Sequence, residues 1–423
     1  MPTTTDVTAP APLTTPDGRP AAALWALHPD LRHLNHGSFG AVPRAALAHQ
    51  DELRQQTELA PVAWFPGLPQ RIEGARRLVA PRLHVEAERL ALVLNASAGA
   101  SVVFGSLTLP PGAEVLVTDH GYGAVTAGAA RAARRAGGRL VTAAVPLEAD
   151  EDEAFEAIWA AVTDRTALVV LDHITSPTAR RLPVGRVCAE ARRRGIATLV
   201  DGAHAPLLLE DPVAEADADV WVGNLHKYGC APRGAAVLVA RPEVAEDLHP
   251  LIDSWGAGLP FPERFDHQGT LDLTSWLAAP TALDTVDREL GWDAVRRYTT
   301  ALADWAQDLV ATALGEASGV DCHARVGMPV GPLRLVGLPG RLATGHLEAN
   351  AMRDRMLAEA GIETAFTAFG GRGYLRLSAH AYNTPEDYLD LVERAVPLLL
   401  AWAVEADPAS APVTVNPQGR REQ

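Results

Sequence analysis

The sequence is poor in cysteine. It has three cysteines in 423 residues, Cys188, Cys230 and Cys322, which are widely spaced and form no C-x-x-C pair. An odd number at these separations excludes a disulfide framework and offers no zinc-ligand spacing. Cysteine usage of this kind is typical of the reducing cytoplasm, which is the compartment that we expect.

The chain also lacks an excess of positive charge, because its formal net charge is −15. A nucleic-acid surface or an anionic-membrane surface needs a basic field, so we expect neither as a partner. A local anion site is still compatible with this charge, since a few backbone N–H groups at the start of a helix can bind a phosphate.

Signals for secretion or membrane insertion are missing as well. The N-terminal segment MPTTTDVTAPAPLTTPDGRP has neither the basic start nor the apolar core of a signal peptide. The most apolar long stretch, Leu90 to Leu109, is interrupted by Asn95 and by serines and glycines. A buried strand that runs into a buried helix explains this stretch better than a membrane span. We therefore expect no membrane segment.

What the sequence does have is a repeated alternation of short apolar runs and helical stretches. Most of the runs are apolar throughout, as expected for strands that helices cover on both faces. Strand–helix–strand repetition predicts an α/β fold with a mostly parallel sheet. The predicted strands are Leu90–Leu94, Glu114–Thr118, Arg139–Val145, Ala167–Leu171, Ala197–Val200, Asp219–Val222 and Ala235–Ala240, and the predicted helices between them include Gly123–Ala136, Glu151–Val162 and Val184–Arg194.

The length of the chain predicts two to three domains. After Pro280 the pattern changes to long helices around short strand-like runs, which predicts a smaller C-terminal α+β domain. Both ends of the chain are rich in proline and polar residues, which favours flexibility. We therefore predict a flexible arm at residues 1–30, a large domain at 31–285, a small domain at 286–405 and a disordered tail at 406–423.

Polar and titratable residues gather directly after the predicted strands. In an open α/β sheet, ligands bind beyond the carboxyl ends of the strands, so these residues are expected to share one site. They are the segments Asn95–Gly99, Asp119–Tyr122, Asp172–Ser176, Asp201–His204 and Gly223–Lys227.

Two of these residues together indicate a cofactor. A lysine after a buried strand, such as Lys227, is partly desolvated, which lowers its pKa and suits it to form a Schiff base. A buried carboxylate such as Asp201 can keep a pyridine nitrogen protonated, as pyridoxal phosphate (PLP) requires to act as an electron sink. Each residue alone has a plainer interpretation, as a surface lysine and as a helix cap. Their separation, 227 − 201 = 26 residues, allows one connection and places both on neighbouring strands.

A phosphate site is predicted at Asn95-Ala-Ser97-Ala-Gly99, where small residues and a hydroxyl begin a helix. Backbone N–H groups and the helix dipole bind phosphate at such a place, although a simple N-cap has the same pattern. Neither G-x-x-x-x-G-K-[ST] nor G-x-G-x-x-G occurs. Metal binding is a competing interpretation, but no H-E-x-x-H or other zinc spacing supports it, so we expect no metal. The histidines that raise it are His120, His173, His204 and His226.

Longer motifs resemble a known family. VDGAHAP at 200–206 and VGNLHKYGCAPRG at 222–234 resemble the cofactor region of class V aminotransferase-fold PLP enzymes, which include the cysteine desulfurases. LNHGSFGAVP at 34–43, DHITSPTARRLPV at 172–184 and YLRLSAHAYN at 374–383 narrow the resemblance to the isopenicillin N epimerase-like branch, which also includes C–S lyases. The resemblance covers roughly residues 30 to 400. It implies the α/β PLP-transferase fold of type I, with a large cofactor domain and a smaller C-terminal α+β domain, and pyridoxal 5′-phosphate as the cofactor.

The resemblance also implies roles around the cofactor. Lys227 would hold the cofactor as an internal aldimine and move the proton at the α-carbon of the substrate. Asp201 would pair with the pyridinium nitrogen, and His204 would lie beside the ring 3-oxygen, with Thr175 or Ser176 also near it. The aromatic ring of Tyr122 would stack on the cofactor. The phosphate contacts would come from Ser97, Ala98, Gly99 and His226, and from Gly269 and Thr270 of a partner subunit, which implies a homodimer with shared active sites.

For the substrate, an amino acid, the resemblance implies a carboxylate contact from Arg376, whose planar guanidinium suits a forked hydrogen bond. Asn35 and His36 would line the substrate entrance. One departure concerns the loop Glu363–Arg372, where cysteine desulfurases carry a catalytic cysteine and this chain has none. Cysteine desulfurase activity is therefore not expected.

The expected reaction begins with removal of the substrate α-proton through the Lys227 aldimine. An isopenicillin N epimerase-like amino-acid epimerase is the leading prediction, and it needs a second acid, for which Tyr122, His204 and His36 are candidates. The alternative is a C–S β-lyase that acts on an S-substituted cysteine or its sulfoxide in secondary metabolism, with aminotransferase or decarboxylating variants less favoured. A non-catalytic ligand-sensing role is disfavoured, because Lys227 is present and the residues before the match cannot supply a DNA-binding domain.

Overall fold

Seven strands form one sheet in the larger part of the protein. The computed structural model describes residues 8–406, and the strand order in this sheet is β2-β8-β7-β6-β5-β3-β4. The strands from β7 to β4 run parallel, while β8 is antiparallel to both of its neighbours, which confirms the predicted mostly parallel sheet. The strands are β2 (Leu90–Val93), β3 (Glu114–Thr118), β4 (Arg139–Ala143), β5 (Thr166–Asp172), β6 (Ala197–Asp201), β7 (Val220–Asn224) and β8 (Ala236–Ala240).

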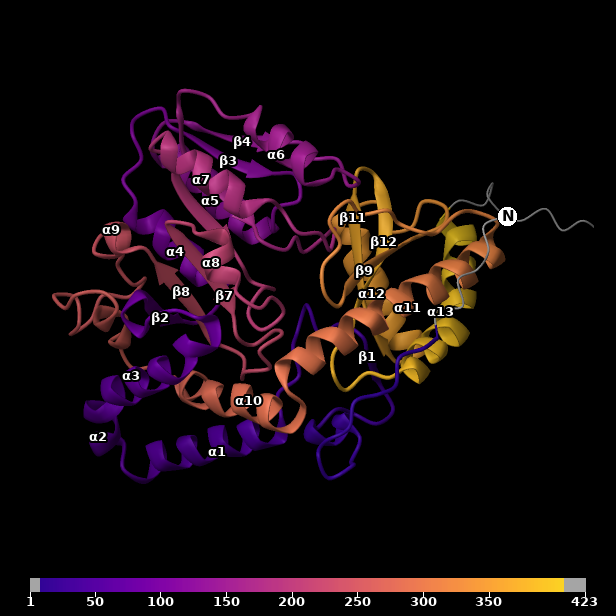
Figure 1. Ribbon diagram of the computed structural model, residues 1–423, viewed down its shortest axis with the longest axis horizontal. Helices are drawn as coiled ribbons and strands as arrows, with labels where there is room; N and C mark the ends of the chain where they lie inside the picture. The colour runs from indigo at the N-terminus through magenta and orange to yellow at the C-terminus, as the bar shows by residue number, and fades with distance from the viewer. Residues whose placement is uncertain (1–7, 407–423) are drawn as a thin grey trace, which may run out of the picture.

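Helices cover both faces of this sheet, as expected for strands whose residues are mostly apolar and buried. One face packs against α4 (Ala96–Ser106) and α5 (Gly123–Arg135), and the other against α7 (Val184–Arg193) (Figure 1). Smaller helices of the large domain are α6 (Glu151–Trp159), α8 (Pro212–Ala216) and α9 (Pro242–Ala245).

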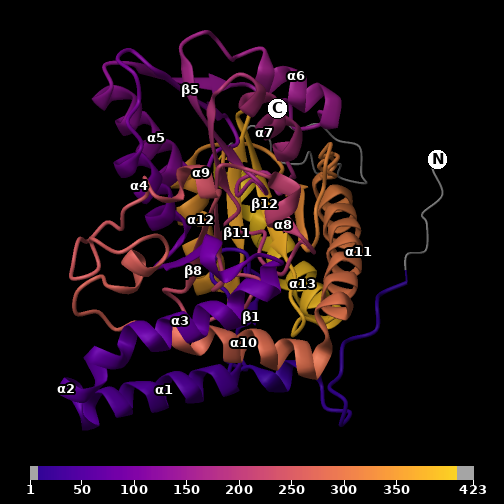
Figure 2. The same ribbon diagram turned by 60° about the vertical axis from the view of Figure 1, so that its left-hand side comes forward.

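A layer of long helices lies beside the edge of the sheet at β2. In two views, α1, α3 and α10 run next to one another (Figures 1 and 2). The helices of this layer are α1 (Arg44–Leu59), α2 (Pro61–Trp64), α3 (Leu68–Val79) and α10 (Thr274–Leu290). The predicted boundary between residues 285 and 286 falls inside α10, and the break between helices comes later, at Gly291, whose φ of +75° ends the helix.

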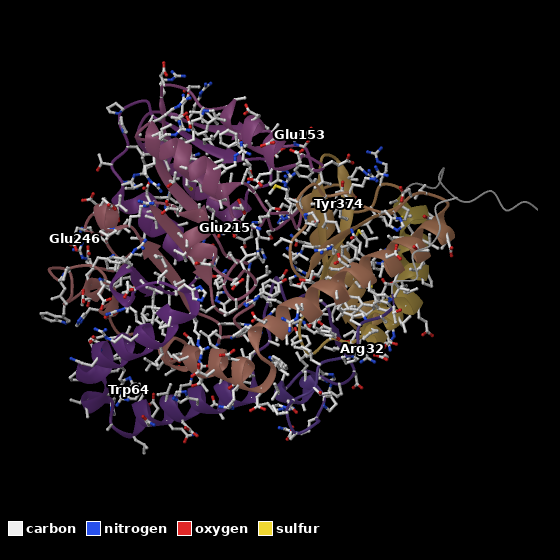
Figure 3. All side chains as sticks on the ribbon, in the orientation of Figure 1. Arg32, Trp64, Glu153, Glu215, Glu246 and Tyr374 are labelled. Atoms are coloured by element: carbon white, nitrogen blue, oxygen red, sulfur yellow. The ribbon has the colours of Figure 1, made fainter. Side chains whose placement is uncertain are left out.

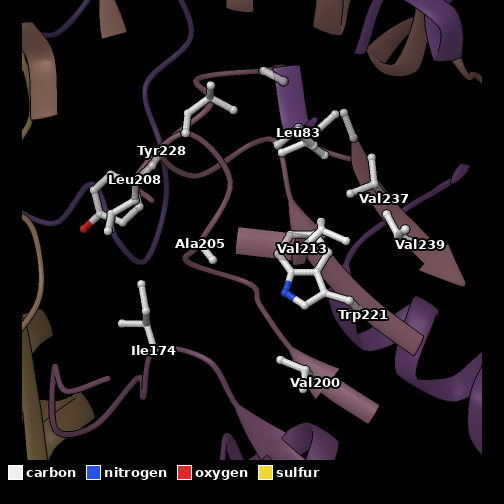
Figure 4. Packing of buried hydrophobic residues seen from close by; sticks show 14 of the residues in the cluster. Leu83, Ile174, Val200, Ala205, Leu208, Val213, Trp221, Tyr228, Val237 and Val239 are labelled. Atoms are coloured by element: carbon white, nitrogen blue, oxygen red, sulfur yellow. The ribbon is translucent and has the colours of Figure 1, made fainter. Parts of the chain in front are cut away.

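Trp221 of β7 is tightly packed near the carboxyl ends of the central strands. Its indole lies among Val200, Val213 and other apolar side chains (Figure 4). A Cβ atom on Gly202 or Gly223 would come within 2.3 or 2.4 Å of the indole, so both positions require glycine. These glycines follow Asp201 and precede the loop of Lys227, and the packing therefore fixes the two backbones that carry the predicted site.

The small domain is an antiparallel sheet, in the order β11-β12-β9, covered by three helices. Arg376 lies in the central strand of this sheet, opposite Leu335 of β9, and Tyr374 two residues before it is marked in Figure 3. The elements are α11 (Trp292–Ser318), β9 (Leu333–Gly337), α12 (His346–Ala360), β10 (Ile362–Glu363), β11 (Ala365–Phe369), β12 (Arg372–Ser378) and α13 (Pro385–Ala406).

The N-terminal segment links the two domains. Strand β1 (Arg32–His33) pairs with β10 of the small domain, and Trp25 is 2% exposed and lies edge-on to His380 and Tyr382. The prediction of a flexible arm at residues 1–30 is therefore wrong at Trp25, because the indole of this residue is buried in the core. Residues 1–7 of the predicted arm and residues 407–423 of the predicted tail lie outside the described residues.

Within residues 8–406, no helix combines the length and the apolar character that crossing a membrane requires. The apolar stretch from Leu90 is strand β2 followed by helix α4, as the sequence predicted.

Candidate active site

The carboxyl ends of β5, β6 and β7 bring three predicted segments together. Asp172 ends β5 and Asp201 ends β6, and the two face each other in the register of the sheet. Lys227 follows β7, and its Nζ lies 3.1 Å from Nε2 of His204. The amine, the carboxylates and the imidazole thus form one cluster at the edge where a ligand of an α/β sheet binds.

Lys227 is the single lysine of the chain, since the other 36 of its 37 basic residues are arginines. Burial lowers the pKa of Lys227 to about 8, an effect that Arg376 reinforces and that Asp201 and Asp172 oppose. Part of the amine is therefore uncharged near neutral pH, as a nucleophile or a base must be. The absence of any other lysine is a signal that the sequence prediction did not use, and it leaves no competing position for a lysine-bound cofactor.

Asp172 is a site residue to which the sequence analysis assigned no role. It is 6% exposed and Asp201 is 3% exposed. Burial raises the pKa of Asp172 well above its usual value and repulsion from Asp201 raises it further. Burial also raises the pKa of Asp201, against the attraction of Lys227. Two buried carboxylates carry two negative charges when ionised, and the single amine beside them balances only one. A protonated pyridine ring would supply the second positive charge.

Replacing Asp172 by asparagine is expected to stabilise the cofactor-free protein above neutral pH. Because its folded-state pKa is raised, this carboxyl favours folding below its usual pKa and loses that contribution as the pH rises through the raised value. Asparagine has no charge, yet its oxygen can still accept the hydrogen bond that the Tyr122 N–H donates. The midpoint of thermal unfolding at pH 8 should rise by about 2 °C or more. Equal shifts at pH 5 and pH 8 would contradict the repulsion argument.

His204 is buried between the Lys227 amine and two backbone carbonyls. Its Nε2 lies 3.0 Å from the Gly37 oxygen and its Nδ1 lies 3.4 Å from the Ile174 oxygen. Burial lowers the pKa of His204 well below its usual value, and Lys227 and Arg376 add to this effect. The imidazole is therefore neutral and acts as a hydrogen-bonding group.

The loop after β5 contains Thr175 and Ser176, whose predicted place near the ring oxygen stays a prediction. The Thr175 hydroxyl is fully buried and bonds within its own loop, to Thr178 and to the Arg180 carbonyl. Ser176 instead accepts hydrogen bonds from Arg376. Thr175 is thus hydrogen-bonded within its own loop, and Ser176 is hydrogen-bonded to Arg376.

The start of α4 has the form of an anion site. Asn95 caps the helix by accepting a hydrogen bond from the Ala98 N–H, while the Asn224 side chain accepts from the Ala96 N–H. Among the described residues, the amide and the hydroxyl of Ser97 have no hydrogen-bond partner. Gly99 packs so closely on Val222 that a Cβ would lie 2.7 Å away. The residues present therefore fit a phosphate at Ser97.

The other predicted cofactor residues lie around this helix start or at the surface. His226 Nδ1 lies 3.0 Å from the Ala235 oxygen, and burial lowers the pKa of His226 to about 4, so its ring is neutral. The Tyr122 side chain, at the start of α5, is 44% exposed. Gly269 and Thr270 are exposed in the single chain, and their predicted contact with a partner stays a prediction.

Arg376 is a buried cation without an acidic partner among the described residues. Its guanidinium donates to the Ser176 carbonyl at 2.7 Å, to Ser38 Oγ at 2.7 Å and to Asn35 Oδ1 at 3.3 Å. Its Nε has no partner although it is buried. A buried charge is usually paired, so this arrangement is suited to receive a carboxylate from a ligand.

Asn35 and His36 lie in different environments. Asn35 contacts Arg376 and also lines a cavity of about 450 Å³ together with Phe39, Arg233 and Thr364. His36 is fully buried, and its nitrogens lie 2.8 Å from Tyr382 Oη and 2.9 Å from the Lys227 oxygen. The prediction that His36 lines a substrate entrance is therefore wrong, because neither nitrogen is free to face a substrate.

One buried group among residues 8–406 has the spacing of metal ligands. The ligand atoms of His36, Cys230 and His380 lie within 4.8 Å of one another. His36 already uses its nitrogens, as described, and Cys230 Sγ lies 3.5 Å from His380 Nε2, within hydrogen-bond distance for sulfur. The predicted absence of a metal stays a prediction.

Comparison with known proteins gives a consistent set of similarities. The family model for aminotransferase class-V matches residues 68–391. The chain is 31% identical over 389 residues to isopenicillin N epimerase from Streptomyces clavuligerus, covering 88% of this chain and 96% of the relative. It is 26% identical to the probable chloroplastic L-cysteine desulfhydrase from Arabidopsis thaliana, covering 85% and 81%. The apo structure of cysteine desulfurase from Thermococcus onnurineus NA1 has a similar fold, with a TM-score of 0.74 at 18% identity over 93% of this chain and 100% of that one.

Proposed function

Since the chain belongs to the aminotransferase class-V family, whose enzymes use pyridoxal 5′-phosphate, we propose that it removes the α-proton of an amino-acid substrate and returns a proton to the opposite face, as an epimerase does. This proposal rests on the family and on the epimerase relative, which covers most of both chains. A finer assignment follows from the residues of the site.

The observation that carries the proposal is that Lys227 lies close enough to Arg376 to feel its charge, and that this buried arginine has no acidic partner among the described residues. An amine that exchanges with a substrate amine, next to a guanidinium that awaits a carboxylate, selects a molecule with both groups on one carbon, an α-amino acid. When bound, PLP supplies the electron sink that stabilises negative charge at that carbon. Ser97 would hold its phosphate, and Asp201, with Asp172 beside it, would hold the proton on its ring nitrogen.

Lys227 is the residue that we propose to take the α-proton. Its pKa of about 8 leaves part of the amine uncharged near neutral pH, which suits a general base. His204 lies 3.1 Å from this amine, so it belongs to the same face of the site. Its neutral ring can orient Lys227, but it is poorly placed to deliver a proton from the other side.

Tyr122 is the second acid that we propose. Of the three candidates, His36 has no free nitrogen and His204 lies on the Lys227 side. Tyr122 is 44% exposed, and its N–H donates to Asp172 Oδ1 at 3.1 Å, so this residue lies at the same edge of the sheet as the carboxylates. We propose that this phenol protonates the α-carbon from the face opposite Lys227.

A C–S β-lyase that acts on an S-substituted cysteine or its sulfoxide is the second candidate, because a relative carries the name L-cysteine desulfhydrase. A desulfurase that uses a cysteine nucleophile is disfavoured. All three cysteines are buried, and burial raises the pKa of each.

The remaining parts of the proposal concern assembly and setting. We propose a homodimer in which the exposed Gly269 and Thr270 reach the phosphate of the partner's cofactor. Three unpaired thiols are the reason for proposing a cytoplasmic protein, and a role in secondary metabolism follows from the epimerase relative.

Reaction in D₂O with the purified PLP-bound protein separates the candidate functions. With isopenicillin N, we expect one deuterium at the α-carbon together with inverted configuration, measured by mass spectrometry and chiral chromatography. The variant Tyr122→Phe should lose inversion by about 100-fold or more while it keeps α-deuterium exchange, because Lys227 is intact.

Other outcomes redirect the assignment. Release of pyruvate and a thiol or sulfenate from S-substituted cysteines or their sulfoxides, without inversion of any substrate, would establish the lyase. Equal loss of exchange and inversion in Tyr122→Phe would remove Tyr122 as the second acid.

A further inference from the structure

A fully buried group of aromatic and thiol side chains lies directly beneath the turn that carries Lys227. His36 stacks on His380 with ring centroids 3.8 Å apart, and Tyr382 packs against both. None of these three side chains contributes to the proposed chemistry, and each is exposed by 4% or less. Within this group, His36 contacts the backbone oxygen of the active-site lysine.

The hydrogen bonds of His36 fix which of its nitrogens carries the proton. A carbonyl oxygen only accepts, so the Nε2 that lies 2.9 Å from the Lys227 oxygen must donate. Nδ1 then has a free lone pair and accepts from the hydroxyl of Tyr382 at 2.8 Å. Burial lowers the pKa of His36 well below its usual value, helped by His380 and His33. Burial also raises the pKa of the Tyr382 phenol, which therefore keeps the proton that it donates.

The Lys227 oxygen receives a second hydrogen bond from within its own turn. The Cys230 N–H donates to it at 2.8 Å, and Cys230 has a φ of +57°, in the left-handed region. The turn alone thus closes on this oxygen, and His36 anchors it to the rest of the protein. Gly40 leaves room for this approach, because a Cβ there would lie 2.8 Å from the Lys227 oxygen and 3.2 Å from His36 Nε2.

The hydrogen bonds that run from the Lys227 oxygen through His36 end at Tyr382, in the small domain. Tyr382 and His380 lie in the segment that follows β12, the strand of Arg376. The residue next to His36, Gly37, also bridges the domains, because its N–H donates to Ser378 Oγ and its carbonyl contacts His204. The segment around His36 therefore ties the lysine turn to the strand that carries the carboxylate-binding arginine.

We propose that His36 is a positioning residue that, through the relay Tyr382–His36–Lys227, holds the lysine turn at a fixed place relative to Arg376. This inference rests on the proposed function, since it assigns to the relay the alignment of the amine with the α-carbon of a substrate held by Arg376. A shift of about 1 Å between reacting groups can cost a factor of about 100 in rate, so a buried anchor at this oxygen affects catalysis without touching the substrate.

The test compares His36→Leu, His36→Gln and Tyr382→Phe with the wild-type protein. Leucine removes both hydrogen bonds, whereas the terminal amide of glutamine reaches the place of Nε2 and keeps the donor to Lys227. We expect kcat for α-deuterium exchange to fall about 10- to 100-fold in His36→Leu, with KM nearly unchanged, and to recover most of the wild-type value in His36→Gln.

A second measurement needs no substrate. When PLP is added to cofactor-free protein, the visible band of the bound cofactor should form more slowly in His36→Leu and in Tyr382→Phe, and the pH at which the band changes should shift. A double variant that combines His36→Leu with Tyr382→Phe should form the band no more slowly than His36→Leu alone, because both residues act on the same oxygen. Cys230→Ala is the matched control, since it removes a neighbouring buried thiol but keeps the N–H donor and the His36 relay.

The outcomes separate this inference from the proposed function. A wild-type protein that forms no cofactor band would overturn the proposed function itself. A normal band and normal exchange in His36→Leu and Tyr382→Phe, with only a lower melting temperature, would overturn the positioning role. Equal losses in His36→Gln and His36→Leu would also overturn it, because the donated hydrogen bond would then be irrelevant.

Discussion

The variant Lys227→Ala is expected to lose the visible absorption band of the bound cofactor and to lose α-proton exchange by at least about 1,000-fold. We propose Lys227 both as the amine that attaches the cofactor and as the base that takes the α-proton. No second lysine can take its place, because the sequence has only one. Absorption spectra of the purified variant after addition of PLP give the first measurement, and deuterium exchange gives the second.

The control for this experiment is a variant that keeps the lysine but changes its surroundings. Asp201→Asn preserves the size of the side chain and the acceptor for the Ala203 N–H, which now donates to Asp201 Oδ1 at 3.0 Å. It should still form a cofactor band, although exchange should slow because the ring nitrogen loses its anionic partner. An unchanged band in Lys227→Ala would refute the assignment of the cofactor to this residue.

The variant Arg376→Ala is expected to bind PLP normally and to lose about 10- to 150-fold in kcat/KM for amino acids, as removal of a charge-assisted hydrogen-bonded contact predicts. The loss should appear chiefly in KM, since the guanidinium is proposed to hold the substrate carboxylate before the reaction begins. Arg376→Lys should recover little, because an ammonium group cannot reproduce the fork of contacts that Arg376 makes.

A matched variant separates this effect from a loss of stability. Arg334 of β9 is also a buried arginine, but it is bound to Asp304 and to backbone carbonyls. Arg334→Ala should lower the melting temperature without a selective rise in KM. An amine substrate that lacks a carboxylate should react equally with wild-type protein and Arg376→Ala; a loss with this substrate too would show that Arg376 does not recognise the carboxylate.

The sequence predicted the large domain well because its strands carry a strong local signal. Runs such as Leu90–Val93 and Ala236–Ala240 are apolar at every position, and the polar residues that follow the strands mark one edge of the sheet. Lys227 and Asp201 could be linked from this pattern alone, since both belong to neighbouring connections. Arg376 could not, because only the resemblance connected a residue of the small domain with this edge.

The features that sequence reasoning missed depend on contacts between distant segments. The environment of His36 is set by Tyr382 and His380, more than 340 residues later in the chain. Trp25 lies in a segment whose composition favours flexibility, and one buried indole outweighs that composition. Asp172 had a local signal, its place at the end of β5, but its role depends on facing Asp201 across the sheet.

The single lysine has a practical consequence for the study of this protein. Pyridoxal phosphate in excess reacts with surface lysines of many proteins, so reduction with borohydride normally traps more cofactor than the active sites hold. Here the only side-chain amine is that of Lys227. The mass added to the lysine-containing peptide after reduction therefore counts competent active sites directly, and each rate can be expressed per working site instead of per chain.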